Sequence, residues 1–423
     1  MALFEKRLLL VLVAASLLLF GCYSAPQPST GEPNKTNVSV PPVGPPANQT
    51  NLTPAVKISK SEVELRMAMR KLWEDHITWT RVYIISAAEG YNDTDQAAAR
   101  LLKNQEDIGN AIKPYYGEAA GNSLTALLKE HILGAVALLD AAKKGNASGV
   151  ADAERNWYKN ADEITELLSG ANPNWKKEDL REMMYEHLNL TEKEAVDRLN
   201  GDYSADVADY DAIHDEILGM SDALSGGIVK QFPEKFADKS GGMTESELSL
   251  RLAERKLWED HVTWTRMYII SVAGNGKDAG PTTARLLKNQ EDIGNAIKPV
   301  YGDSAGSNLT ALLKEHILGA AALLDAAKKG NATAAADAET GWYRNADEIA
   351  AFLGAANPNW PEDDMKGMLH EHLKNTKAEA VARLTGDYAG DVAAYDIVHS
   401  QGLMMADGLS GGIVRQFPEK FSK

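Results

Sequence analysis

The stretch ARLLKNQEDIGNAIKP fills residues 99–114 and recurs without a change at residues 284–299. Outward from it, residues 65–236 and 250–421 align without a gap at a constant offset of 185 residues. A period this long indicates a duplicated domain, because solenoid repeats have periods of roughly 20–50 residues. We therefore expect two copies of one folding unit.

The apolar residues of each copy recur every three or four positions, and the alternation typical of strands is absent. The sequence therefore predicts an all-α protein made of two tandem antiparallel bundles, each of about six helices joined by short connections. Repeat 1 is assigned to residues 61–236, a linker to residues 237–248 and repeat 2 to residues 249–423. Gly226-Gly227 is expected to stop the sixth helix. The helices expected in repeat 1 span 61–88, 94–113, 119–144, 148–169, 177–199 and 202–224.

Residues 1–22 have the pattern of a secretory signal with a lipidation site. A positively charged start precedes an apolar run from Leu8 to Phe20, which is too short for a comfortable membrane span. Gly21 and Cys22 follow, and Cys22 is the only cysteine of the chain. This pattern favours an extracytoplasmic protein anchored to the membrane through a lipid on Cys22. An uncleaved signal anchor is the alternative.

The next segment, residues 23–60, is rich in Pro, Ser, Thr and Asn, which predicts a disordered tether that buries no core. Sequons of the form Asn-x-Ser/Thr are dense in this segment and favour glycosylation of an exported chain. In the whole chain they begin at Asn34, Asn37, Asn48, Asn51, Asn92, Asn146, Asn189, Asn308 and Asn331.

The charge balance and the cysteine count exclude some classes of function and of metal site. The formal net charge is −16 and no basic stripe is present, so the chain is not expected to bind nucleic acid. The repeats contain no cysteine, which excludes disulfides and thiolate metal sites there. The sequence indicates no particular protein partner.

Each repeat carries four histidines on the apolar stripes of four different predicted helices. Residues at such spacing share the inward face of a bundle. Each histidine also lies near the middle of its helix, so the four imidazoles are expected at one level, facing inward. They are His76, His131, His187 and His214 in repeat 1, and His261, His316, His372 and His399 in repeat 2.

A layer of inward histidines has two interpretations. Neutral imidazole is the commonest protein ligand for Zn, Cu and Fe, so the layer is a candidate site for a transition metal or a haem. The alternative is a structural, hydrogen-bonded polar layer in a non-catalytic protein, and no catalytic motif indicates a reaction. Residues expected to support the histidines are Gln105 and Asp211, with Gln290 and Asp396 in repeat 2. Glu74-Asp75 is expected to be solvated, because it lies about 100° or more from the stripe.

Several stretches are long enough to be specific: LWEDHxTWTR at 72–81, LLKNQEDIGNAIKPYYG at 101–117, LLKEHI and NADEI. They resemble an uncharacterised family of small single-domain helical proteins from bacteria and methanogenic archaea. The resemblance covers residues 63–236 and 248–421, supports the assigned repeats and leaves the function open. Two copies behind a lipid anchor differ from typical members of that family.

Overall fold

The computed structural model describes residues 57–423, which form eleven α-helices and two short 3-10 helices. The predicted all-α class is confirmed. Residues 1–22, including Cys22, and the first four sequons lie outside the described residues. Within the described part, no helix is long and apolar enough to cross a membrane.

The helices of repeat 1 follow the predicted order. They are α2 (Lys60–Glu89), α3 (Thr94–Lys143), α4 (Ala147–Ala171), α5 (Lys177–Asn200), α6 (Tyr203–Gln231) and η1 (Pro233–Phe236). The long α3 consists of two arms that meet at Gly117, whose φ of 81° lies in the left-handed region. These arms correspond to the predicted second and third helices.

Repeat 2 has the same order, with Gly302 at the position of Gly117 and a φ of 85°. Its helices are α7 (Glu245–Gly274), α8 (Ala279–Tyr301), α9 (Asp303–Lys328), α10 (Ala332–Ala356), α11 (Glu362–Thr385), α12 (Tyr388–Gln416) and η2 (Pro418–Phe421).

The predicted stop at Gly226-Gly227 is wrong, because α6 continues through both glycines to Gln231. Gly227 is needed for close packing instead: a Cβ atom there would lie 1.9 Å from Nε1 of Trp175. The Trp175 indole N–H donates to the Leu224 carbonyl, 3.2 Å away, and so crosses the helix at this point. Gly412 gives Trp360 the same close approach in α12, 1.9 Å from a Cβ to Nε1, although the Trp360 indole N–H has no hydrogen-bond partner.

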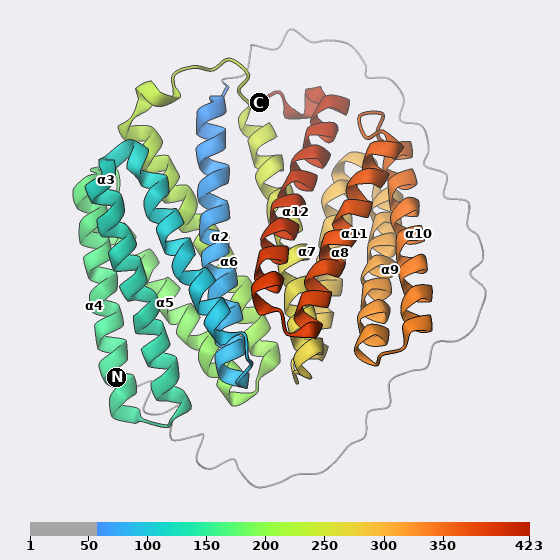
Figure 1. Cartoon of the computed structure of the whole chain (residues 1–423). Helices are drawn as coiled ribbons and strands as arrows, with labels where there is room; N and C mark the ends of the chain where they lie inside the picture. Colours follow the sequence, from blue (N-terminus) through green and yellow to red (C-terminus); the bar gives the residue numbers. More distant parts are fainter. Residues whose placement is uncertain (1–56) are drawn as a thin grey trace. The chain divides into compact units, whose positions relative to one another are not determined.

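Short turns reverse the chain after every helix, so alternate helices of a repeat run in the same direction (Figure 1). In repeat 1, α2, the second arm of α3 and α5 are parallel to one another. In repeat 2, the parallel set is α7, α9 and α11. Both repeats belong to one compact unit, in which α2 packs on α7, α6 on α8 and α12 on α3.

Candidate metal centres

Three of the four histidines in each repeat converge in the bundle core, one from each parallel helix. One ring nitrogen of each lies within 4.8 Å of the ring nitrogens of the other two. All six side chains are buried, with 2–3% of their surface exposed. The sets are His76, His131 and His187, here called site 1, and His261, His316 and His372, called site 2.

An asparagine on the neighbouring helix fixes the ring of one ligand in each site. In site 1, Asn160 donates through Nδ2 to the Leu127 carbonyl at 3.0 Å, which leaves its Oδ1 facing Nδ1 of His131 at 3.2 Å. Because Oδ1 only accepts, His131 carries its proton on Nδ1 and presents an unprotonated Nε2 to the site. Asn345 holds His316 in the same way, also at 3.2 Å.

The support of the second ligand differs between the sites. In site 1, the Glu216 carboxylate lies 3.1 Å from Nδ1 of His187 and accepts a hydrogen bond from it. In repeat 2 the corresponding residue is Gln401, whose Oε1 instead accepts from Asn375 at 3.1 Å. Nδ1 of His372 is consequently buried without a partner. A carboxylate on the remote nitrogen makes an imidazole a better ligand, so the two sites are chemically unequal.

Gln105 and Gln290 lie where the sequence predicted supporting residues. No hydrogen bond joins Gln105 to His76 or Gln290 to His261, since Nδ1 of each histidine and Oε1 of each glutamine are buried without a partner. Each glutamine amide is held by donation to a backbone carbonyl one turn earlier, at 2.8 Å from Leu101 O in repeat 1. Both amides are fully buried, and Nε2 of each also donates to the side chain of the preceding asparagine.

Burial keeps five of the six imidazoles neutral. Loss of solvation is the main cause that lowers the pKa of His131 and of His316 to about 3, and repulsion by a neighbouring histidine adds to it. The same causes hold the pKa of His76 and of His372 well below the usual range. Burial also lowers the pKa of His261 to about 4. Neutral imidazole is the form that binds a metal.

Apolar residues close one side of each site. In site 2, the residues one turn before the three histidines are Trp258, Leu313 and Leu369, all buried. In site 1 they are Trp73, Leu128 and Met184, also buried. Trp157 and Trp342 flank the sites laterally, with ring centroids 5.3 and 5.4 Å from His131 and His316. Such a shell excludes water and strengthens any charge interaction inside it.

The fourth histidine of each repeat lies elsewhere, at the contact between the repeats. Nδ1 of His214 is 3.1 Å from Asp260 of repeat 2, and Nε2 is 3.3 Å from Glu74. His399 mirrors it: Nδ1 lies 3.0 Å from Asp75 of repeat 1, and Nε2 contacts Glu259. His214 and His399 thus face carboxylates from both repeats and not the other histidines.

These contacts change two expectations from the sequence. Glu74 and Asp75 are buried, with 3% and 2% exposure, because the other repeat covers the face of α2 that seemed solvated. The carboxylates on the fourth histidines are not the predicted Asp211 and Asp396. Asp211 pairs with Arg285 at 2.6 Å, and Asp396 pairs with Arg100 at 2.9 Å.

The carboxylates around His214 and His399 favour the charged imidazolium over its cost of burial. They raise the pKa of His214 to about 9 and that of His399 to about 10. The Asp260 carboxyl, beside His214, has a pKa well below its usual range despite its burial. His214 and His399 therefore carry a charge at neutral pH, opposite to the five histidines of the sites whose pKa is lowered, which fits different roles.

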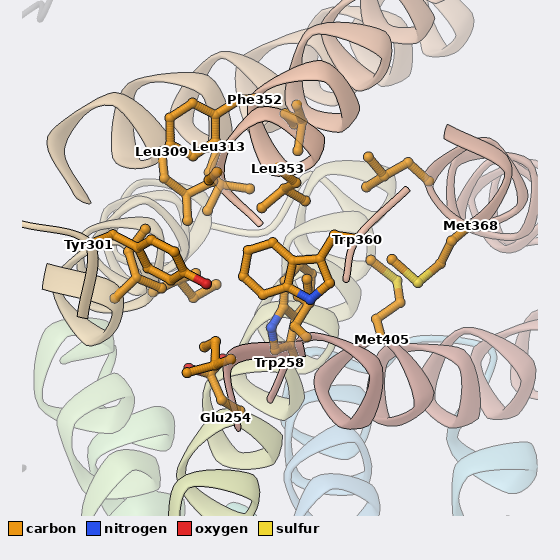
Figure 2. A pocket seen from close by; sticks show the side chains of 17 residues that line it. Glu254, Trp258, Tyr301, Leu309, Leu313, Phe352, Leu353, Trp360, Met368 and Met405 are labelled. Atoms are coloured by element: carbon orange, nitrogen blue, oxygen red, sulfur yellow. The ribbon is translucent and has the colours of Figure 1, made fainter. Parts of the chain in front are cut away.

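Repeat 2 also has a buried acidic residue, Glu254, at a position where repeat 1 has none. Glu254 lines a cavity of about 30 Å³ among Trp258, Tyr301 and Trp360 (Figure 2). Burial raises the pKa of Glu254 to about 7. Repeat 1 has Met69 at the corresponding position, in an apolar setting.

Glu254→Met should therefore stabilise the chain at pH 8, by about 1–3 kcal/mol. The folded-state pKa of Glu254 lies above the ordinary 4.5, so the unfolded chain loses this proton first and stability falls as pH rises from 4.5 through 7. Urea unfolding at pH 5 and pH 8 measures the effect, which should shrink at pH 5. The reciprocal Met69→Glu should destabilise at pH 8; equal stability of both variants with the natural chain would contradict the prediction.

Asn160 and Glu216 are the residues of site 1 that were missed from sequence. Asn160 begins the NADEI stretch, and the repetition of this stretch in repeat 2 is a signal that could have identified it. Glu216 follows His214 by two positions and carries no signal of its own, since its partner His187 lies on another helix. Comparison with family models, curated proteins and solved structures finds no match to this chain, so its function has to be inferred from these sites.

Proposed function

We propose that the chain is a metal-binding protein that holds one transition-metal ion in each repeat through three histidines. The observation that carries the proposal is the convergence of three buried imidazoles within 4.8 Å, twice in the chain. A single buried histidine needs no metal. Three imidazoles that approach this closely, with Nε2 of His131 and of His316 unprotonated, form a ready set of metal ligands.

The donor set favours Zn²⁺, Cu or Fe over Mg²⁺ or Ca²⁺, which take oxygen ligands. Three protein ligands leave one position of a tetrahedral Zn²⁺ open, as in catalytic zinc sites. Haem fits less well, because it takes two imidazoles on opposite faces, and a third ring with its centroid 5.5–6.2 Å from both would occupy the place of the porphyrin in site 1. The sequence of residues 1–22 supports a location outside the cytoplasm, anchored to the membrane.

Metal titration tests the proposal. The full chain, stripped with a chelator, should bind two equivalents of Co²⁺ and develop the visible absorption of a low-symmetry nitrogen-coordinated ion. Elemental analysis of the chain reloaded with Zn²⁺ should give two ions per chain. No binding of Co²⁺, Zn²⁺ or Cu²⁺ would contradict the proposal and favour a structural histidine layer.

The two ions should differ in affinity, because Glu216 supports His187 whereas Gln401 leaves His372 without an acceptor. We expect Glu216→Gln to weaken the tighter site about 10- to 100-fold, the usual effect of removing such a support. Gln401→Glu should strengthen the weaker site. Competition with a chromophoric chelator measures both constants in each variant.

The double variant is the control for these two single variants. Glu216→Gln combined with Gln401→Glu should restore two unequal sites with their order exchanged. Two equal affinities in the natural chain, or no change in either single variant, would show that the carboxylate has no influence on the ion.

A further inference from the structure

Repeat 2 contains a cavity of about 340 Å³ between α7, α9, α10 and α11. Its lining is mainly apolar, and short side chains leave the space open. This volume is within the range of sites that hold small organic molecules. The alanines of the lining are Ala320, Ala327, Ala332, Ala335, Ala336 and Ala380.

The cavity adjoins site 2. Because α7, α9 and α11 run in the same direction, the residues four positions after the three histidines form the next layer, about 6 Å away along the helices. All three of them line the cavity: Thr265, Ala320 and Thr376. The other side of the histidines is closed by a tryptophan and two leucines. A free coordination position of an ion in site 2 therefore has space on the cavity side.

Two polar groups of this lining have no partner, the indole N–H of Trp342 and the hydroxyl of Thr376, and only the latter belongs to the layer next to the histidines. Thr376 is 5% exposed, and its hydroxyl is buried without a hydrogen bond. The Thr265 hydroxyl, in contrast, donates to the His261 carbonyl at 2.7 Å. Thr376 lines the cavity, and a buried hydroxyl without a partner is costly unless something pairs with it.

The cavity reaches the surface between α10 and α11. Val381, on its rim, is 48% exposed. Glu339 and Lys377 also line it and form a half-exposed ion pair between the two helices at 2.5 Å. A small molecule can therefore enter from solvent without opening the core.

We propose that this cavity binds a small, mainly apolar molecule with one polar group, which it presents to Thr376 and to the ion of site 2. The part of the proposal that concerns the ion rests on the proposed metal binding; the cavity itself does not. The apolar lining accepts the body of the molecule, and the layer next to the histidines accepts its polar end.

The first experiment needs no metal. The chelator-treated full chain is titrated with 1-aminoanthracene, a neutral apolar fluorophore. We expect one bound molecule and an affinity about tenfold lower in Ala335→Val, because two added methyl groups fill the space. Repeat 1 carries Val150 at this position, 1% exposed, so valine is already accepted there by the same fold. No fluorescence change, or equal affinity in Ala335→Val, would overturn the proposal.

The second experiment tests the link to site 2. The Co²⁺-loaded chain is titrated with 4-phenylimidazole, whose ring nitrogen can take an open metal position. The absorption of one of the two ions should change, and Ala335→Val should suppress that change. A response of both ions alike, or of neither, would overturn the assignment to site 2. A chain that binds 1-aminoanthracene but no Co²⁺ would keep the cavity and refute the proposed metal binding.

Thr376→Val isolates the polar contact. It should weaken the binding of 1-aminoanthracene and of 4-phenylimidazole several-fold, since each probe carries a nitrogen that can pair with the Thr376 hydroxyl. Thr191→Val, at the corresponding position of repeat 1, is the matched control and should change neither. Equal effects of the two variants would remove Thr376 from the site.

Discussion

His131→Ala should reduce the metal bound by the chain from two ions to one. Site 1 has three ligands, and the loss of one leaves two imidazoles, too few to hold an ion against water in a buried position. His316→Ala should abolish site 2 in the same way, and the double variant should bind none. Elemental analysis after reloading with Zn²⁺, together with Co²⁺ absorption, measures the stoichiometry.

His370→Ala is the matched control. His370 belongs to repeat 2 and to the same helix as His372, but its ring is 34% exposed and pairs with Asp347 at 2.7 Å. Its removal should leave both ions bound. Two ions in the double variant would show that metal binds elsewhere, whereas loss of metal in His370→Ala would show that the measurement reports nonspecific surface binding.

His214→Leu should destabilise the chain by about 3–5 kcal/mol at pH 7, because it leaves Glu74 and Asp260 buried without the imidazolium between them. The contact between the repeats should be the first to weaken. Urea unfolding followed by tryptophan fluorescence should show a lower first midpoint. Unfolding in two steps would report separation of the repeats before their own unfolding.

The stabilising effect of His214 should depend on pH. Its pKa is raised from 6.5 to about 9 in the folded chain, so its contribution is fully present below pH 6.5 and is lost as pH rises through 9. His399 follows the same rule through pH 10. The natural chain should therefore lose stability as pH rises from 6.5 to about 10, and His214→Leu should cost less at pH 10 than at pH 7. An equal cost at both pH values would show that His214 acts through packing alone.

The histidine stripes were predictable because helical periodicity places residues on the inward face of their own bundle. Near-equal positions within parallel helices then put His76, His131 and His187 at one level, which the structure confirms. The same reasoning placed His214 with them, and there it failed. A period of three and four residues identifies a buried face, but it does not say which neighbour buries it.

Glu74 and Asp75 are a second case in which the helical period did not predict the neighbour that buries a residue. On a helix that touches neighbours on one face only, carboxylates turned away from the stripe lie in water. Here α2 is covered on two faces, by its own repeat and by α7. No local pattern in repeat 1 predicts that α7 packs on α2, because α7 lies 185 positions further along the sequence.

The sequence by itself determined the duplication, the all-α class and the helix bounds to within a few residues except at α6. It also identified eight inward-facing histidines, six of which meet. These features depend on local periodicity and on self-similarity, both of which are visible in one dimension. Only the tertiary structure decided that three histidines and not four share a site, that Glu216 supports one site and Gln401 does not support the other, and that an alanine-lined cavity adjoins site 2. Each of these depends on which side chains of different helices come within a few ångströms, and that is set by the packing of the whole chain.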